Sequence, residues 1–129
     1  GYTYSAHPVG AAAVVACLAE TKRLDTRTNA AARGTQLFDG AKALMERYDV
    51  IGDVRGGHGL MCAVELVADR ATKAPLDNDA MKRVHTAMYG SGVMVRLIGN
   101  NIAMSPPLIV TAEQIDTMLA GIEAGLKAI

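Results

Sequence analysis

The sequence predicts an α+β fold in which helices cover a small, mainly antiparallel β-sheet. Two observations lead to this prediction. Helical and strand patterns alternate along the chain in the order helix, helix, two strands, helix, two strands, helix. Half of the 129 residues are hydrophobic, which is enough to bury one modest core. The chain therefore fits a single compact layer of helices on strands.

The first predicted helix begins at Pro8, a residue favoured at the first helical position, and runs to about Arg23. Residues 9–19 are apolar on every side of this helix. A helix of this kind is normally buried all round, and so small a domain can hardly provide that burial. We therefore expect it to form an interface with missing parts of the protein or with a second subunit.

The second helix is predicted from about Asn29 to Arg47, because apolar residues recur at helical spacing between positions 37 and 48. Two strands, residues 50–55 and 60–67, follow and are joined by a Gly-Gly-His-Gly turn. The second strand is apolar on nearly both faces, with Glu65 as the exception. It is therefore expected to be a central strand covered by helices.

A polar segment, residues 69–79, is predicted to be a surface loop. Apolar residues from Met81 to Met88 then mark a third helix that ends near Gly90–Gly92. Residues 93–96 and 102–104 are expected to pair as a hairpin across a Gly-Asn-Asn turn. Thr111 is placed to cap the last helix, with Gln114 completing a capping box.

Charge and cysteine content exclude several classes of function. Thirteen basic and thirteen acidic residues balance, and no basic stripe is interleaved with aromatic residues, so neither nucleic acid nor a membrane is expected as a partner. No residues have the spacing of a metal site. Cys17 and Cys62 are predicted to be buried thiols of a protein from a reducing compartment, the cytoplasm.

Two places in the sequence could carry chemistry. The opening Gly-Tyr-Thr-Tyr-Ser-Ala-His-Pro leads into a helix, and the Thr3 hydroxyl there suits an anion; the alternative is that Thr3 and Ser5 are local caps. Arg96 leaves a short apolar strand just before a turn. It could bind a carboxylate through two hydrogen bonds, or it could be an ordinary surface arginine at a strand end.

Four stretches resemble class III pyridoxal-phosphate aminotransferases, in particular the ω-amino acid or amine:pyruvate branch. They are Gly-Tyr-Thr-Tyr-Ser-Ala-His-Pro-Val at the start, Val-Arg-Gly-Gly-His-Gly-Leu-Met at 54–61, Val-Glu-Leu-Val at 64–67, and the run from Val95 to Thr111. The resemblance covers essentially the whole chain but only the C-terminal part of such an enzyme. It implies a fragment: residues 1–28 link to an absent large domain, and residues 29–129 form the small domain of fold type I.

The resemblance also implies site residues. Thr3 and Tyr2 are expected to bind the phosphate of pyridoxal 5'-phosphate held by the neighbouring subunit of a homodimer. Arg96 is expected to bind the substrate carboxylate. Ala6 stands where many members of the family have glycine, and we expect only that a small residue is required there.

The chain alone is expected to be inactive and to hold no catalytic residue. None of its lysines resembles the Schiff-base lysine of the family; they are Lys22, Lys42, Lys73, Lys82 and Lys127. The parent enzyme is expected to move an amino group from an ω-amino acid or amine to pyruvate. Alternatives are another class III enzyme, such as a taurine:pyruvate aminotransferase or an aminomutase, or a free-standing non-catalytic domain that binds a partner.

Overall fold

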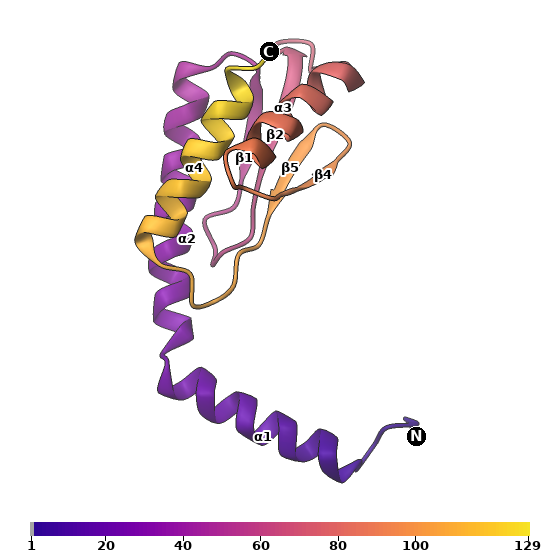
Figure 1. Cartoon of the computed structure of the whole chain (residues 1–129), viewed down its shortest axis with the longest axis vertical. Helices are drawn as coiled ribbons and strands as arrows, with labels where there is room; N and C mark the ends of the chain where they lie inside the picture. Colours follow the sequence, from indigo (N-terminus) through magenta and orange to yellow (C-terminus); the bar gives the residue numbers. More distant parts are fainter. Residues whose placement is uncertain (1) are drawn as a thin grey trace.

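A computed structural model of the chain describes residues 2–129 (Figure 1). They form a projecting helix, Pro8–Arg23, and a layered body, residues 26–129. Helices of the body pack on one face of a small antiparallel sheet. The α+β class predicted from the sequence is therefore confirmed. In chain order the elements are α1 (Pro8–Arg23), α2 (Thr26–Arg47), β1 (Ile51–Arg55), β2 (Cys62–Asp69), β3 (Ala74–Pro75), α3 (Asn78–Gly90), β4 (Arg96–Ile98), β5 (Asn101–Met104) and α4 (Ala112–Leu126).

Helix α1 has the bounds expected from the sequence, but none of its residues is buried. It projects away from the body (Figure 1) and touches the rest of the chain only near the start of α2. Asp25, in a left-handed conformation, separates the two helices. Asp tolerates this conformation better than most residues, so α2 begins at once, at Thr26 rather than at Asn29 as predicted.

Helices α2 and α4 pack against each other along the body. The predicted stripe of α2 is buried at Leu37, Ala41 and Leu44. In α4 the corresponding stripe buries Ile115 and Ile122, which are fully inaccessible to solvent. Together with Met81, Val84 and Met88 of α3, these residues form the helical side of the core.

A cluster of polar side chains ties the end of α2 to α4. Glu123 accepts hydrogen bonds from the Tyr48 hydroxyl at 2.9 Å and from Arg47 at 3.2 Å, and its carboxylate lies 3.1 Å from the Lys127 ammonium. Hydrogen bonds from Lys127, Tyr48 and Arg47 together lower the pKa of Glu123 to about 2. This carboxylate is therefore ionised throughout the physiological range.

The main sheet has the strand order β1-β2-β5-β4, with every pair antiparallel, and β2 lies in its interior as predicted. Cys62, Val64 and Leu66 of β2 point into the core. The helices cover only this face. On the opposite face Ala63 and Glu65 stay partly exposed, so the expectation of a strand covered on both sides is met on one side only.

The hairpin that carries Arg96 differs from the prediction. Strand β4 begins at Arg96 instead of ending there, and Ile98 pairs with Asn101 across a two-residue turn, Gly99-Asn100. Val93 is instead packed against Gly121 of α4, where an added Cβ would lie 2.5 Å from the valine side chain. Core packing therefore takes Val93 out of the sheet.

The remaining elements follow local capping rules. The Thr111 side chain accepts from the Gln114 amide and the Gln114 side chain accepts from the Thr111 amide, which confirms the predicted capping box. The Asp77 side chain caps α3 by accepting hydrogen bonds from the amides of Asp79 and Ala80. The predicted loop 69–79 contains one short strand that the sequence did not indicate, β3, which pairs with the end of β2.

Candidate functional site

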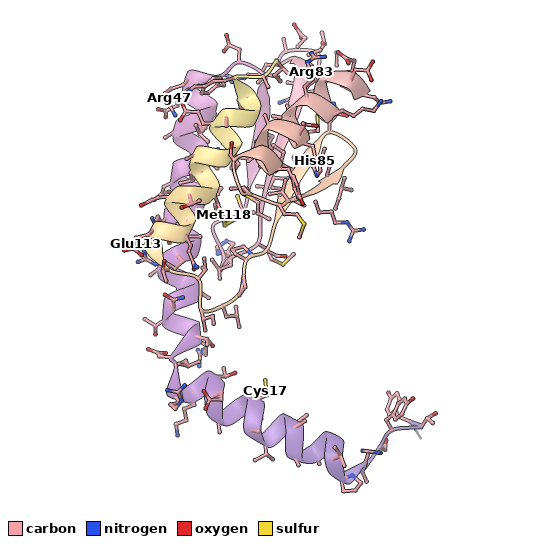
Figure 2. All side chains as sticks on the ribbon, in the orientation of Figure 1. Cys17, Arg47, Arg83, His85, Glu113 and Met118 are labelled. Carbon is pink, nitrogen blue, oxygen red and sulfur yellow. The ribbon has the colours of Figure 1, made fainter. Side chains whose placement is uncertain are left out.

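An open cleft of about 720 Å³ lies beside the start of β4. Its walls come from the segment before β4, the end of β5, the connector 105–111 and the first turns of α4. Arg96 lines this cleft together with Met94, Ile109 and Met118; Figure 2 labels Met118 on α4. The cleft therefore combines one guanidinium group with a largely apolar wall.

Arg96 is exposed and pairs with Ala103 of β5. Across residues 2–129 no carboxylate forms an ion pair with it. An arginine that is not neutralised by its own chain can still bind an external carboxylate or sulfonate through two parallel hydrogen bonds. This arginine is a binding residue predicted from the sequence, and the structure places it at a cleft. The apolar residues of that cleft were not predicted: Met94 and Met118 lie outside the stretches that resemble the family, and Ile109 lies within one of them but has no polar group that marks it as a site residue.

The N-terminal turn forms the second candidate site. The Ser5 amide donates to the Tyr2 carbonyl at 3.0 Å and the His7 amide donates to the Tyr4 carbonyl at 3.3 Å. Tyr2 and Thr3 are exposed. The turn is thus a preformed loop whose hydroxyl-bearing side chains face solvent.

His7, and neither Thr3 nor Ser5, is the N-cap of α1. Its Nδ1 accepts a hydrogen bond from the Gly10 amide at 3.2 Å. The alternative in which Thr3 and Ser5 cap the helix is therefore wrong for the N-cap position. The first turn of α1 contains no acidic residue, so no carboxylate of that turn opposes an anion near the N-terminus of the helix.

Ala6 has φ 58°, in the left-handed region. Glycine adopts this region without steric cost, whereas the Cβ of alanine comes too close to the following carbonyl oxygen. The expectation that only a small residue is needed at this position was therefore incomplete. What the turn requires is the backbone conformation that glycine provides most easily.

The structure does not bring the two candidate sites together. The N-terminal turn lies at the free end of α1, and the cleft lies in the body (Figure 1). Thr3 and Arg96 of the same chain therefore belong to different sites.

A network of charged side chains lies on the uncovered face of the sheet. Arg55 of β1 lies 2.8 Å from Asp53 and 2.9 Å from Glu65 of β2, and it also donates to the Asn101 side chain of β5. Hydrogen bonds to Glu65 and Asp53 raise the pKa of Arg55. Partial burial opposes ionisation of Asp53, but the hydrogen bond from Arg55 prevails and lowers its pKa. This network was not expected from the sequence.

One cysteine prediction is wrong. Cys62 is buried as expected, and burial raises the pKa of its thiol. Cys17 is exposed on α1 (Figure 2). The reason is that α1 packs against little of the chain, so the apolar surroundings of Cys17 in the sequence do not become a buried environment.

Residues 2–129 contain neither a metal-binding cluster nor a helix that could span a membrane. No group of three or more His, Cys, Asp or Glu side chains is placed to hold a metal ion there. None of the helices in this part of the chain has the length and hydropathy needed to cross a bilayer.

The model of the family described as aminotransferase class-III matches residues 1–126. The chain belongs to this family. The resemblance of its motifs is thereby confirmed over nearly the whole sequence, and so is the type of fold, since solved transaminases share it.

Relatives of known activity and structure agree with this assignment. The chain is 38% identical over 108 residues to a hypotaurine/taurine–pyruvate aminotransferase of Paracoccus denitrificans, covering 78% of this chain and 23% of that protein. It is 32% identical to a taurine–pyruvate aminotransferase of Bilophila wadsworthia, covering 98% and 29%. The chain therefore spans less than a third of the length of these relatives.

Solved structures of transaminases superpose on almost all of the chain. A PLP-bound amine transaminase from an uncultivated Pseudomonas species is 43% identical, with a TM-score of 0.89, over 98% of this chain and 29% of that one. An (S)-enantioselective ω-transaminase from Thermomicrobium roseum is 34% identical, with a TM-score of 0.87, over 98% and 28%. The arrangement of α1 and the body thus occurs in much longer enzymes.

Proposed function

We propose that this chain supplies the C-terminal part of a pyridoxal-phosphate-dependent aminotransferase that moves an amino group from an ω-amino acid or amine to pyruvate. The observation that carries the proposal is the unneutralised Arg96 at the rim of a mainly apolar cleft. When bound, the cofactor supplies the electron sink for the reaction. The lysine that anchors it belongs to sequence outside this chain.

In this proposal Arg96 binds the carboxylate of the keto acid or amino acid. Two parallel hydrogen bonds from the guanidinium group fix the position of the carboxylate. The apolar wall formed by Met94, Ile109 and Met118 excludes water from the rest of the substrate. Arg96 and the apolar wall together orient the reacting carbon without taking part in bond making.

Thr3 and Tyr2 are proposed to bind the cofactor phosphate of a second subunit. The Thr3 hydroxyl can donate to a phosphate oxygen, and the N-terminus of α1 favours negative charge. The separation of the turn from the cleft supports a homodimer in which each turn serves the other subunit's site. The exposed apolar side chains of α1 support the same arrangement, because they need a cover.

A cytoplasmic location is part of the proposal. Cys17 and Cys62 are both free thiols. Free thiols of this kind persist most readily in a reducing compartment.

Substitution of Arg96 tests the substrate role in the full-length protein that contains this chain. Arg96→Ala is expected to raise the KM for pyruvate about tenfold or more, because a bidentate charged contact is lost. The KM for an amine donor without a carboxylate, such as 1-phenylethylamine, is expected to stay within about twofold. Arg83→Ala, which removes an exposed arginine of α3 (Figure 2), is the matched control. An equal rise of the KM for pyruvate and of the KM for 1-phenylethylamine would contradict the role of Arg96.

The phosphate role of Thr3 has its own test. Thr3→Val keeps the shape of the side chain but removes the hydroxyl, so retention of pyridoxal phosphate during dialysis should fall. Thr3→Ser keeps the hydroxyl and should retain the cofactor as the unchanged protein does. A Thr3→Val enzyme with unchanged cofactor retention would remove Thr3 from the phosphate site.

A taurine:pyruvate aminotransferase is the second candidate. Several relatives carry this name or include it in theirs, and two of the three oxygens of a sulfonate can accept the two parallel hydrogen bonds of a guanidinium group, as the two oxygens of a carboxylate do. Comparison of taurine with β-alanine as amino donor separates the two candidates. A preference for taurine would favour the second one.

A further inference from the structure

The hairpin β4–β5 determines where Arg96 lies. Strand β4 has only three residues and pairs with β5 alone, at the edge of the sheet. Such a short edge strand has little register information of its own. The position of Arg96 therefore depends on what holds β5 and the turn in place.

The tip of the hairpin is anchored on the β2 side. The Asn100 side chain donates to the carbonyls of Leu66 and Leu76, both at 3.1 Å, and the Leu66 amide donates to the Asn100 carbonyl at 2.8 Å. These bonds fix the turn to β2 and to the segment before α3. They do not involve the sheet face that carries Arg96.

The uncovered face has a separate anchor in Arg55. Asp53 and Glu65 lie directly opposite each other on β1 and β2, and like charges in this position repel. Arg55 bridges the two carboxylates and extends across β2 to the Asn101 side chain. Asn101 in turn donates to the Ile98 carbonyl at 3.3 Å, inside the hairpin. A continuous path of hydrogen bonds therefore runs from β1 to β4.

The register places the two arginines on one row of this face. Arg55 pairs with Ala63, Ala63 pairs with Ala103, and Ala103 pairs with Arg96. Because side chains of paired residues lie on the same face, Arg55 and Arg96 stand at the two ends of a row with alanines between them. Arg55 is neutralised by two carboxylates, whereas Arg96 has no such partner, so only Arg96 is available to an anionic substrate.

We propose that Arg55, acting through Asn101, is a positioning residue that holds the β4–β5 hairpin so that Arg96 meets the substrate carboxylate. This inference rests on the proposed function of Arg96. It gives the charged network a part in substrate specificity beyond its contribution to the sheet. Neither Arg55 nor Asn101 need touch the substrate.

Steady-state kinetics of the full-length protein that contains this chain test the proposal. Asn101→Ala breaks the link while Arg96 remains, so the KM for pyruvate is expected to rise about three- to tenfold. The KM for 1-phenylethylamine should stay within about twofold, since this donor has no carboxylate. Asn101→Asp keeps an oxygen acceptor for Arg55 but lacks the N–H that donates to the Ile98 carbonyl, so the KM for pyruvate is expected to rise as it does in Asn101→Ala. Arg47→Ala, an arginine on α2 paired with Glu123 on the far side of the body, is the control and should change neither KM.

A double variant distinguishes positioning from a general effect on folding. In the Arg96→Ala background, Asn101→Ala should add no further rise in the KM for pyruvate, because the group it positions is gone. Arg55→Lys serves as a second variant, since lysine lacks the planar fork that joins Asp53, Glu65 and Asn101. It should show the same selective effect on pyruvate.

The possible results separate this inference from the proposed function. If Arg96→Ala is selective for pyruvate and the Asn101 and Arg55 variants are not, the positioning role is wrong and the role of Arg96 stands. The positioning role is also overturned if the KM values for pyruvate and 1-phenylethylamine rise by the same factor. It is likewise overturned if Asn101→Ala raises the KM for pyruvate further in the Arg96→Ala background. If Arg96→Ala itself is not selective, the role of Arg96 fails and this inference fails with it.

Discussion

Helices α1 and α4 are nearly equal in length, 16 and 15 residues, and both are rich in alanine and other apolar residues, yet only α4 is part of the core. In α4 the large apolar residues recur on one stripe, and that stripe packs against α2 and α3. In α1 they surround the helix, and Val9, Val15 and Leu18 are all more than 60% exposed. A one-sided stripe indicates packing within the same chain, whereas all-round apolarity indicates burial by other polypeptide.

The largest difference between the two helices is expected from truncation of aliphatic side chains. Ile122 of α4 is fully buried, so Ile122→Ala should lower the free energy of unfolding by about 2–5 kcal/mol. Val15 of α1 is 68% exposed, and Val15→Ala should change the unfolding of the body by no more than about 0.5 kcal/mol. Urea denaturation of both variants measures the comparison. A loss for Val15→Ala as large as that for Ile122→Ala would show that the body depends on α1.

Glycine to alanine substitutions should have opposite signs in α2 and α1. An added Cβ at Gly34 would lie 2.0 Å from the Gly59 carbonyl oxygen, so Gly34→Ala must displace backbone and should cost about 1–3 kcal/mol. At Gly10 the nearest atoms lie 3.8 Å away, and alanine should favour the helix by about 0.5–1 kcal/mol. Thermal unfolding checks the first effect, and amide exchange in α1 checks the second. A stable Gly34→Ala variant would refute the close approach of α2 to the turn before β2.

Alanine to glycine substitutions at the start of α1 probe the left-handed residue. Ala6→Gly should relieve a cost of about 1 kcal/mol in the N-terminal turn. Ala11→Gly, at a right-handed helical position, should instead weaken α1 by about 0.5–1 kcal/mol. Protection of the His7 amide from exchange, which the turn bond to Tyr4 provides, should rise in the first variant. An unchanged or lower protection would mean that the turn is not limited by Ala6.

The smallest effect is expected from the charged cluster between α2 and α4, and it should depend on pH. The pKa of Glu123 is lowered to about 2 by hydrogen bonds from Lys127, Tyr48 and Arg47, so its stabilising effect is complete above the ordinary value of 4.5 and is lost as pH falls toward 2. Glu123→Gln should therefore reduce stability at pH 7 and have much less effect near pH 2. Unfolding midpoints at both pH values provide the measurement. If Glu123→Gln lowers the unfolding midpoint equally at both pH values, the ionised carboxylate of Glu123 is not the source of the stabilisation.

The sequence predicted the order of the elements because each long element carries a local signal. Helix α1 begins at Pro8, and α4 begins after the Thr111–Gln114 capping box. Glycines with positive φ occur in the turns. The errors occur where tertiary packing overrides the local signal. Val93 is a typical strand residue, but its side chain packs against Gly121 of α4. For this reason β4 begins only at Arg96.

The candidate site was predictable only where a motif marks it. Arg96 and the N-terminal turn belong to stretches that resemble the family, so both were found. The network of Arg55, Glu65 and Asn101 joins residues from three strands. Its members become neighbours only through the register of β1, β2 and β5, and no spacing along the chain encodes that register.

The packing of α4 on α2 has a consequence for synthesis of the chain. Contacts between these helices join residues 26–47 with residues 112–126, and the connecting strands and α3 lie between them in sequence. A nascent chain can therefore form α2 and the β1–β2 hairpin early but cannot close the core until α4 has left the ribosome. During that interval the side of α2 that packs against α4 is uncovered, and a chaperone that recognises apolar helices would find its substrate there.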